Sequence, residues 1–319
     1  MLKNIFSRFF PDKHGEELDT IDHWGDQANR LEKEARPTAW SDHPFIISNY
    51  INPAVAGNSK TGWLEAISRD FFPQPVARVL GLGCGGGALE LQGVHWKIGK
   101  CFEGFDFSQG AIELARKNAN EAGVSHIIKY EVADLNTHVF PEDDFDAVFA
   151  SQSVHHIADL EHYMAQVARA LKPGGLFVIN EFVGPNQFQW TDNQLFHANR
   201  LLHLIPDELR IGLRSNTFVE EISRPTIDHM NAIDPTEAIR SGDIIETLEN
   251  NFEIVEKRDF GGTLLQLVLN DIAGNFTDSD EHVALLESLI EEERALINTG
   301  EIISDFTLIV ARNSKIKSH

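Results

Sequence analysis

Residues 77–92 have the sequence ARVLGLGCGGGALELQ. The stretch opens with apolar residues typical of a buried strand, passes through a run of glycines, and ends in residues that favour a helix. Glycine is needed where the backbone takes a positive φ or lies close to a ligand, and the N-terminus of a helix offers free N–H groups. We therefore expect a polar ligand to lie against this loop.

The glycines of the loop fit two patterns, so the loop alone names no cofactor. Gly81, Gly83 and Gly86 satisfy the dinucleotide-binding pattern G-x-G-x-x-G. Gly83, Gly85 and Gly87 satisfy the tighter pattern G-x-G-x-G. A glycine-rich turn that binds nothing is a third interpretation, and the residues downstream must distinguish the three.

The next unit along the chain is a predicted strand at residues 101–106, followed by a predicted helix. Ser108 is the expected N-cap of that helix and Gly123 its C-terminal stop. Asp106 lies 19 residues after Gly87, where an acid can accept hydrogen bonds from both ribose hydroxyls of a bound nucleoside. Repeated strand, loop and helix units predict a parallel α/β sheet.

A third strand is predicted at residues 126–132, and Asp134 follows it. An acid just beyond the carboxyl end of a parallel strand points into the crevice where ligands of open α/β sheets bind. Asp134 is therefore a candidate acceptor for an adenine amino group, although a turn or helix-capping role fits the same position. Further strands are predicted at 145–151 and 176–181.

Two histidines that follow the fourth predicted strand are candidate catalytic bases. His155 and His156 lie between the carboxyl end of that strand and a helix predicted from the apolar spacing over residues 157–171. A histidine in this location can reach a substrate and accept a proton near neutral pH. The alternative is that each histidine only caps or packs the helix. Glu181, at the end of the fifth strand, is a second choice.

The spacing of apolar residues predicts four segments along the chain. The third is a helical insertion, which we expect to form a lid over the acceptor together with the N-terminal helices. Aromatic residues at such positions more often build an insertion's own core, but four residues are candidates for lining the lid: Phe188, Trp190, Phe196 and His197. The segments are an N-terminal helical segment (1–73), a core from the glycine loop to the fifth strand (74–186), the insertion (187–250), and the last two strands with a further helical stretch (251–319).

Composition limits the classes of partner. The chain has 27 Lys and Arg against 49 Asp and Glu, and the resulting net charge of −22 would repel a nucleic acid or an anionic membrane. Its two cysteines, Cys84 and Cys101, form no C-x-x-C or Cys/His cluster, so neither a disulfide framework nor a metal site is expected. No apolar run approaches the ~20 residues of a membrane span. We expect a cytoplasmic protein with a small-molecule substrate, and leave open whether it is a homo-oligomer.

Five stretches together resemble the class I S-adenosylmethionine-dependent methyltransferases, especially their small-molecule branch. The resemblance covers about a third of the chain and is carried by the order and spacing of the stretches rather than by any one of them. LKPGG in particular has no role in a dehydrogenase. The stretches are VLGLGCGGG (79–87), GFDFS (104–108), ADL (133–135), FDAVFASQSVHHI (145–157) and LKPGG (171–175).

The resemblance implies a Rossmann-like, seven-stranded, mostly parallel sheet with helices on both faces. It implies S-adenosylmethionine as the cofactor, converted to S-adenosylhomocysteine, with the glycine loop around its methionine part. Asp106 would then bind the ribose hydroxyls, Phe107 the adenine face and Asp134 the adenine amino group. The other cofactor-binding residues that the resemblance implies are Gly81, Gly83, Cys84, Gly85, Gly87, Ser108, Leu135 beside Asp134, and Ser151 near the sulfonium end.

One position departs from the family pattern. Members usually have Asp or Glu where this chain has Gly81, and that acid helps to hold the cofactor's amino group, often through water. One hydrogen bond to a charged group is worth about 1.5–3 kcal/mol, so its loss would weaken binding without forbidding it. Another residue, such as one in the N-terminal helices, would otherwise supply the acid.

The resemblance implies methyl transfer by in-line displacement to a hydroxyl or amine of a small or mid-sized acceptor. A sugar, a lipid-linked intermediate or a natural-product-like compound would fit. Two alternatives stay open at this point. An NAD-dependent oxidoreductase is allowed by the G-x-G-x-x-G alignment, and a catalytically silent S-adenosylmethionine-binding regulatory protein is allowed by Gly81.

Overall fold

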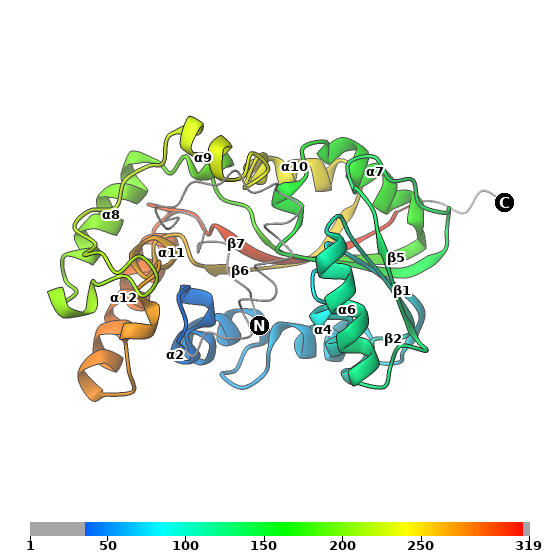
Figure 1. Cartoon of the computed structure of the whole chain (residues 1–319), viewed down its shortest axis with the longest axis horizontal. Coiled ribbons are helices and arrows are strands. Elements are labelled where there is room, and N and C mark those ends of the chain that lie inside the picture. The colour runs from blue at the N-terminus through cyan, green and yellow to red at the C-terminus, as the bar shows by residue number, and fades with distance from the viewer. Residues whose placement is uncertain (1–35, 315–319) are drawn as a thin grey trace.

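The computed structural model describes residues 36–314, and a single sheet runs through the centre of this part of the chain (Figure 1). Its seven strands lie in the order β3-β2-β1-β4-β5-β7-β6. The predicted seven-stranded α/β sheet is therefore confirmed. The strands are β1 (Val76–Leu82), β2 (Gly99–Asp106), β3 (Ile128–Val132), β4 (Phe145–Ser151), β5 (Leu171–Phe182), β6 (Glu253–Gly261) and β7 (Phe306–Arg312).

The strand order creates a crevice beside β1. From β1 the chain proceeds outward through β2 and β3 on one side and through β4 and β5 on the other, and all four neighbouring pairs are parallel. Ligands of such sheets bind outside the carboxyl ends of the strands at the point where the order reverses. Strand β7 lies between β5 and β6 and runs antiparallel to both, so β6 forms the edge of the sheet on that side.

Helices cover both faces of the sheet, as Figure 1 shows. Helices α7 and α10 pack on the face that Leu80 and Val148 present, and α4, α5 and α6 pack on the face of Val79 and Phe149. The α-helices are α2 (Pro44–Ile46), α3 (Asn52–Ala56), α4 (Trp63–Phe71), α5 (Ala88–His95), α6 (Gln109–Glu121), α7 (Leu160–Ala170), α8 (Asp192–Leu202), α9 (Ile227–Ile233), α10 (Ile244–Glu249), α11 (Leu265–Val268) and α12 (Asp280–Asn298). Short 3-10 turns are η1 (Trp40–Asp42), η3 (Val154–His156), η4 (Asn186–Phe188), η5 (Asp207–Leu209), η6 (Ser241–Asp243) and η7 (Ala273–Asn275), and η2 (Ile47–Ile51) is a π-helix.

Local sequence explains most of these boundaries, and the starts of α7 and β5 differ most from expectation. Helix α7 begins at Leu160 rather than near residue 157, because the Asp159 side chain accepts a hydrogen bond from His162 N at 2.9 Å and caps it. Strand β5 begins at Leu171 rather than at 176, because Leu171 already pairs with Phe145 of β4, and the register then shifts before Leu176.

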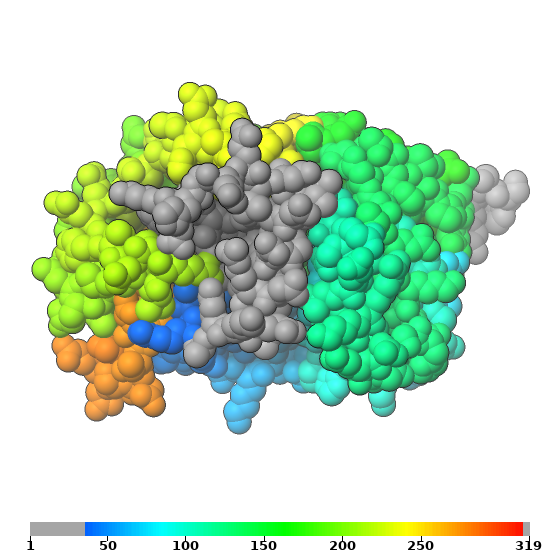
Figure 2. Space-filling view, in the orientation of Figure 1, coloured from blue at the N-terminus to red at the C-terminus, as the bar shows by residue number. Residues whose placement is uncertain are grey.

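Helices α8, α9, α11 and α12 lie toward the other end of the molecule from α6 (Figure 1). Residues 192–202 and 227–233 form helices α8 and α9, which lie opposite α6 in the same view (Figures 1 and 2). Residues 1–35 of the expected N-terminal helical segment lie outside the described residues. Among residues 36–314, no helix combines the length and the apolar character needed to cross a membrane.

Glu293 of α12 joins three parts of this end of the molecule. Its buried carboxylate accepts hydrogen bonds from Tyr50 Oη at 2.6 Å, from Gly262 N at 2.7 Å and from the backbone N–H groups of Leu264 and Leu265 at 2.6 and 2.8 Å. Burial raises the pKa of Glu293, and these hydrogen bonds act in the opposite direction. The carboxylate therefore fixes the N-terminal helices and the start of α11 against α12.

We predict that Glu293→Ala lowers the free energy of unfolding by roughly 2–4 kcal/mol, because four buried donors lose their acceptor. Urea unfolding followed by circular dichroism measures this loss. Glu291→Ala is the matched control, since Glu291 is an exposed residue of the same helix. Equal stability of the two variants would show that the Glu293 contacts contribute nothing net.

Candidate active site

The loop after β1 adopts the tighter of its two glycine patterns. Gly83, Gly85 and Gly87 have φ angles of +65°, +52° and +78°, whereas Gly81 and Gly86 do not take positive φ. These are angles that other residues adopt only under strain. Gly87 is the N-cap of α5, so the free backbone N–H groups at the start of this helix lie next to the crevice.

Asp106 fastens this loop to the end of β2. Its buried carboxylate accepts hydrogen bonds from Gly85 N and from Ser108 N, both at 2.9 Å. Its backbone carbonyl accepts from Ala133 N at 2.9 Å, which brings the end of β3 to the same place. Burial raises the pKa of Asp106, and the two N–H donors act to lower it. The ends of three strands thus meet at one residue, Asp106.

The structure places the other expected cofactor residues around that point without testing their roles. Phe107 is 39% exposed and directly follows Asp106. Asp134 is exposed and accepts from Asn136 N at 2.9 Å, which is the turn role considered above. Leu135 is buried among core side chains, and Ser151 ends β4 half-buried. Their contacts to a cofactor stay predictions.

Glu90 is a site residue that the sequence analysis missed. It lies on α5 and is 1% exposed, and a side chain at Gly81 would overlap its Oε1 atom. Neither carboxylate oxygen has a protein partner at normal hydrogen-bond geometry. Burial raises its pKa to about 8, and the charge of Asp106 adds to the shift. Its surroundings are a small cavity lined by Leu64, Val79, Leu89, Ile98, Phe102 and Phe149.

The close approach of Glu90 to Gly81 is indicated by two features of the sequence. Glu90 is an acid within the apolar start of α5, and Gly81 is a glycine inside a buried strand. A glycine in a strand marks a place where another group approaches closely. The Glu90 carboxylate on α5 occupies the space beside Gly81 that a side chain on β1 would fill.

Glu181 organises the loop that carries the two histidines. The carboxylate is fully buried at the end of β5 and accepts from Ser153 N and Val154 N, each at 2.8 Å. Its other oxygen lies 2.5 Å from His155 Nδ1. The Ser153 hydroxyl donates to Leu82 O at 3.0 Å, so the loop lies directly beside the glycine turn. Glu181 supports this loop and has no open side toward a substrate.

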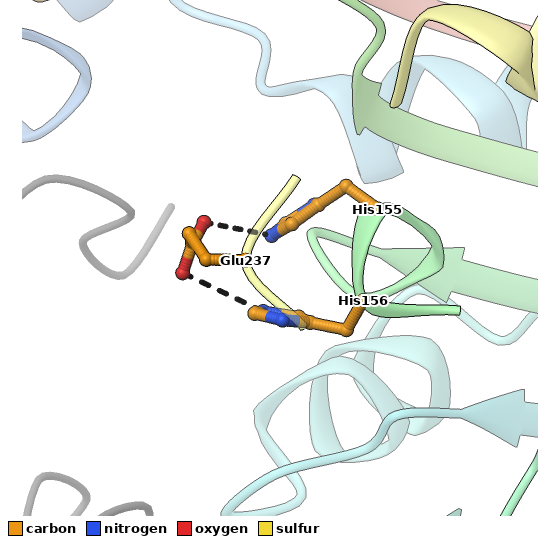
Figure 3. A group of neighbouring side chains, drawn as sticks. All are labelled: His155, His156 and Glu237. Atoms are coloured by element: carbon orange, nitrogen blue, oxygen red, sulfur yellow. Dashed lines mark ion pairs between the residues drawn. The ribbon is translucent and has the colours of Figure 1, made fainter. Parts of the chain in front are cut away.

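His155 and His156 converge on Glu237, which comes from the insertion (Figure 3). His155 Nε2 lies 3.5 Å from Glu237 Oε1, and His156 Nε2 lies 4.0 Å from Glu237 Oε2. The His156 Nδ1 atom is 3.1 Å from Thr236 Oγ1. The side chains of His155 and Glu237 are 1% and 3% exposed, and that of His156 is 18% exposed. The histidines are predictable from their place after a strand, whereas Glu237 lies some 80 residues further along the chain and carries no such signal.

The expected lid residues take different places. Phe188 and Trp190 are buried, and their rings stack with centroids 5.5 Å apart. Phe196 is 65% exposed, and His197 Nε2 lies 3.8 Å from Glu301 Oε1. Phe188 and Trp190 therefore belong to a hydrophobic core, which is the alternative weighed for them.

Comparison with known proteins agrees with this arrangement. Residues 80–179 match the family model described as "Methyltransferase domain". The chain is 31% identical over 139 residues to phosphoethanolamine N-methyltransferase 2 of Caenorhabditis elegans, covering 42% of this chain and 29% of that protein. It is 33% identical over 144 residues to the ubiquinone biosynthesis O-methyltransferase of a Methylobacterium strain, covering 44% and 56%. The chain thus spans less than two thirds of either relative.

A solved structure extends the likeness in fold. The geranyl diphosphate C-methyltransferase of Streptomyces coelicolor A3(2) superposes with a TM-score of 0.50 over 94% of this chain and 100% of that one, at 12% identity. The matched family region contains the glycine loop, Asp106 and both histidines. The chain therefore carries a class I S-adenosylmethionine-dependent methyltransferase domain.

Proposed function

We propose that this protein transfers the methyl group of S-adenosylmethionine to a hydroxyl or amine of a small or mid-sized acceptor. The observation that supports it most is the hydrogen bond from Gly85 N to Asp106, which joins the glycine turn to the acid after β2 inside the matched domain. The sulfonium group supplies an already activated methyl. The protein's part is then to align the acceptor atom and to exclude water.

The residues around the crevice fit the cofactor. Each Asp106 oxygen accepts one protein hydrogen bond, which leaves lone pairs for two ribose hydroxyls. The exposed Phe107 ring offers a face to the adenine. Glu90 supplies the acid toward the cofactor's ammonium group, in the place that Gly81 leaves open. An ammonium group beside Glu90 would stabilise the ionised carboxylate, which the apolar surroundings of Glu90 otherwise destabilise.

The acceptor side of the site is the loop at residues 151–157 together with the insertion. Support comes from Glu237 of the insertion, which reaches His155 and His156 beside the glycine turn. The relatives act on chemically different acceptors, as their names state, so the class of acceptor rests on this polar cluster alone. The insertion as a lid and His155 or His156 as a base both remain predictions.

We predict that S-adenosylhomocysteine binds and NAD does not, as measured by isothermal titration calorimetry. Asp106→Asn should weaken S-adenosylhomocysteine binding by about 10- to 100-fold, since it replaces a charged acceptor of the ribose hydroxyls with an amide. Asp228→Asn, at an exposed position of α9, is the control. Binding of NAD in place of S-adenosylhomocysteine would refute the proposed function.

The transfer itself is tested by incubating the protein with S-adenosylmethionine and a panel of hydroxyl and amine acceptors. Release of S-adenosylhomocysteine should exceed that of the Asp106→Asn variant for at least one acceptor. Tight cofactor binding without transfer to any acceptor would favour a regulatory protein instead.

We predict that Glu90→Gln weakens S-adenosylhomocysteine binding by about tenfold, because the amide cannot pair ionically with the ammonium group. The double variant Gly81→Asp, Glu90→Ala should bind more tightly than Glu90→Ala alone, since it returns the acid to β1 and removes the side chain that would collide with it. Unchanged binding by Glu90→Gln would show that Glu90 has no part in cofactor binding.

Glu90 also predicts a pH dependence of stability. The native state holds its proton up to a pKa of about 8, whereas the unfolded chain releases it near 4.5. The native state therefore binds the extra proton in this window, and its stability falls as the pH rises from about 4.5 to 8, by about 1.4 kcal/mol per unit at most. Urea unfolding without ligand at pH 5.5 and pH 8 should show a smaller loss for Glu90→Gln than for the wild type. Equal losses would contradict the raised pKa.

A further inference from the structure

The cluster formed by His155, His156 and Glu237 has the composition of a metal site. Each residue offers one ligand atom, and the three atoms lie within 4.8 Å of one another (Figure 3). They come from two separate parts of the chain, the 3-10 turn η3 after β4 and the loop that precedes η6. Two imidazoles and one carboxylate are a common ligand set for Zn²⁺ and related transition metal ions, whereas Mg²⁺ and Ca²⁺ prefer oxygen ligands alone.

The hydrogen bonds around the cluster orient the imidazoles for coordination. His155 Nδ1 lies 2.5 Å from a Glu181 oxygen, and a carboxylate can only accept, so Nδ1 carries a proton. The Thr236 hydroxyl donates to Asp234 Oδ1 at 2.6 Å, so it accepts from His156 Nδ1. In the neutral form of each ring the lone pair is then on Nε2. A second partner that fixes the tautomer in this way is a regular feature of histidines that bind metals.

Both Nε2 atoms face the same carboxylate. His155 Nε2 lies 3.5 Å from one Glu237 oxygen and His156 Nε2 lies 4.0 Å from the other. Two nitrogen lone pairs and a carboxylate facing one another favour a positive charge between them. A cation about 2.0–2.2 Å from each ligand places tetrahedral ligand atoms roughly 3.3–3.6 Å apart. The distance from His155 Nε2 to Glu237 Oε1 falls within this range. The three ligand atoms lie within 4.8 Å of one another, so the His156 side chain must move toward the other two ligands to complete the site.

We propose that His155, His156 and Glu237 bind a divalent transition metal ion of the Zn²⁺ class. Among residues 36–314 these three side chains supply the ligands, and sites with three protein ligands bind a substrate at a fourth, open position. The adjoining Ser153 hydroxyl donates to Leu82 O, so the cation lies beside the glycine turn. If the proposed methyl transfer holds, the open position holds the acceptor's oxygen or nitrogen, and the histidines act as ligands rather than as free bases. Cation binding itself does not depend on methyl transfer.

The test uses the full chain without an affinity tag, stripped with a chelator and titrated with Zn²⁺ alone. We expect one equivalent to bind, and Co²⁺ in its place to give the visible absorption of a low-coordinate site. Glu237→Gln and His156→Ala should each weaken Zn²⁺ binding by at least tenfold. His203→Ala, which removes an exposed histidine, should leave it unchanged. Thr236→Val should weaken it less than His156→Ala does, because it removes only the group that orients the ring.

The controls separate a lost site from a lost fold. Every variant is also titrated with S-adenosylhomocysteine, and a variant that still binds it is folded around the crevice. Zn²⁺ affinity that is the same in wild type, Glu237→Gln and His156→Ala would overturn the metal site, as would the absence of Co²⁺ absorption. If the wild type binds Zn²⁺ but not S-adenosylhomocysteine, the proposed function is refuted and the metal site stands.

Discussion

The site depends on one buried carboxylate that holds two loops together. Asp106 accepts an N–H from the turn after β1 and another from Ser108 at the start of α6. Two further hydrogen bonds support the same junction, from Cys84 N to Phe105 O at 3.0 Å and from Asn118 Nδ2 to Gly86 O at 2.9 Å. Charged acceptors of backbone N–H groups give strong hydrogen bonds in a buried setting. The glycine turn can keep its positive φ angles because this acceptor fixes its position.

Much of this arrangement is visible in the sequence because it is local. Glycine spacing, strand-end acids and the Ser108 cap all depend on neighbours a few residues away, and the Ser108 side chain does accept from Ala111 N at 3.2 Å. The choice between the two glycine patterns is different, because it depends on the positive φ angles of Gly83, Gly85 and Gly87, which only the structure shows.

The rest could not be predicted because it depends on contacts between distant residues. Glu90 becomes part of the site only when α5 packs on β1, and Glu237 only when the insertion reaches the loop after β4. Phe188 and Trp190 show the converse, since aromatic residues in an insertion look the same in sequence whether they line a pocket or fill a core. In each of these cases the direction of the side chain, rather than the residue type, determines whether the residue lies in the site or in a core.

Because Glu237 belongs to the insertion, the candidate site is built from two separate stretches of the chain. The contacts of the Asp106 carboxylate come from residues 83–108, whereas one of the three side chains in the His155, His156 and Glu237 cluster comes from the insertion. Replacement of residues 187–250 by a different set of helices would leave the Asp106 contacts intact. In a protein built in this way, exchange of the insertion alone can change the specificity. The residues around Asp106 then stay the same.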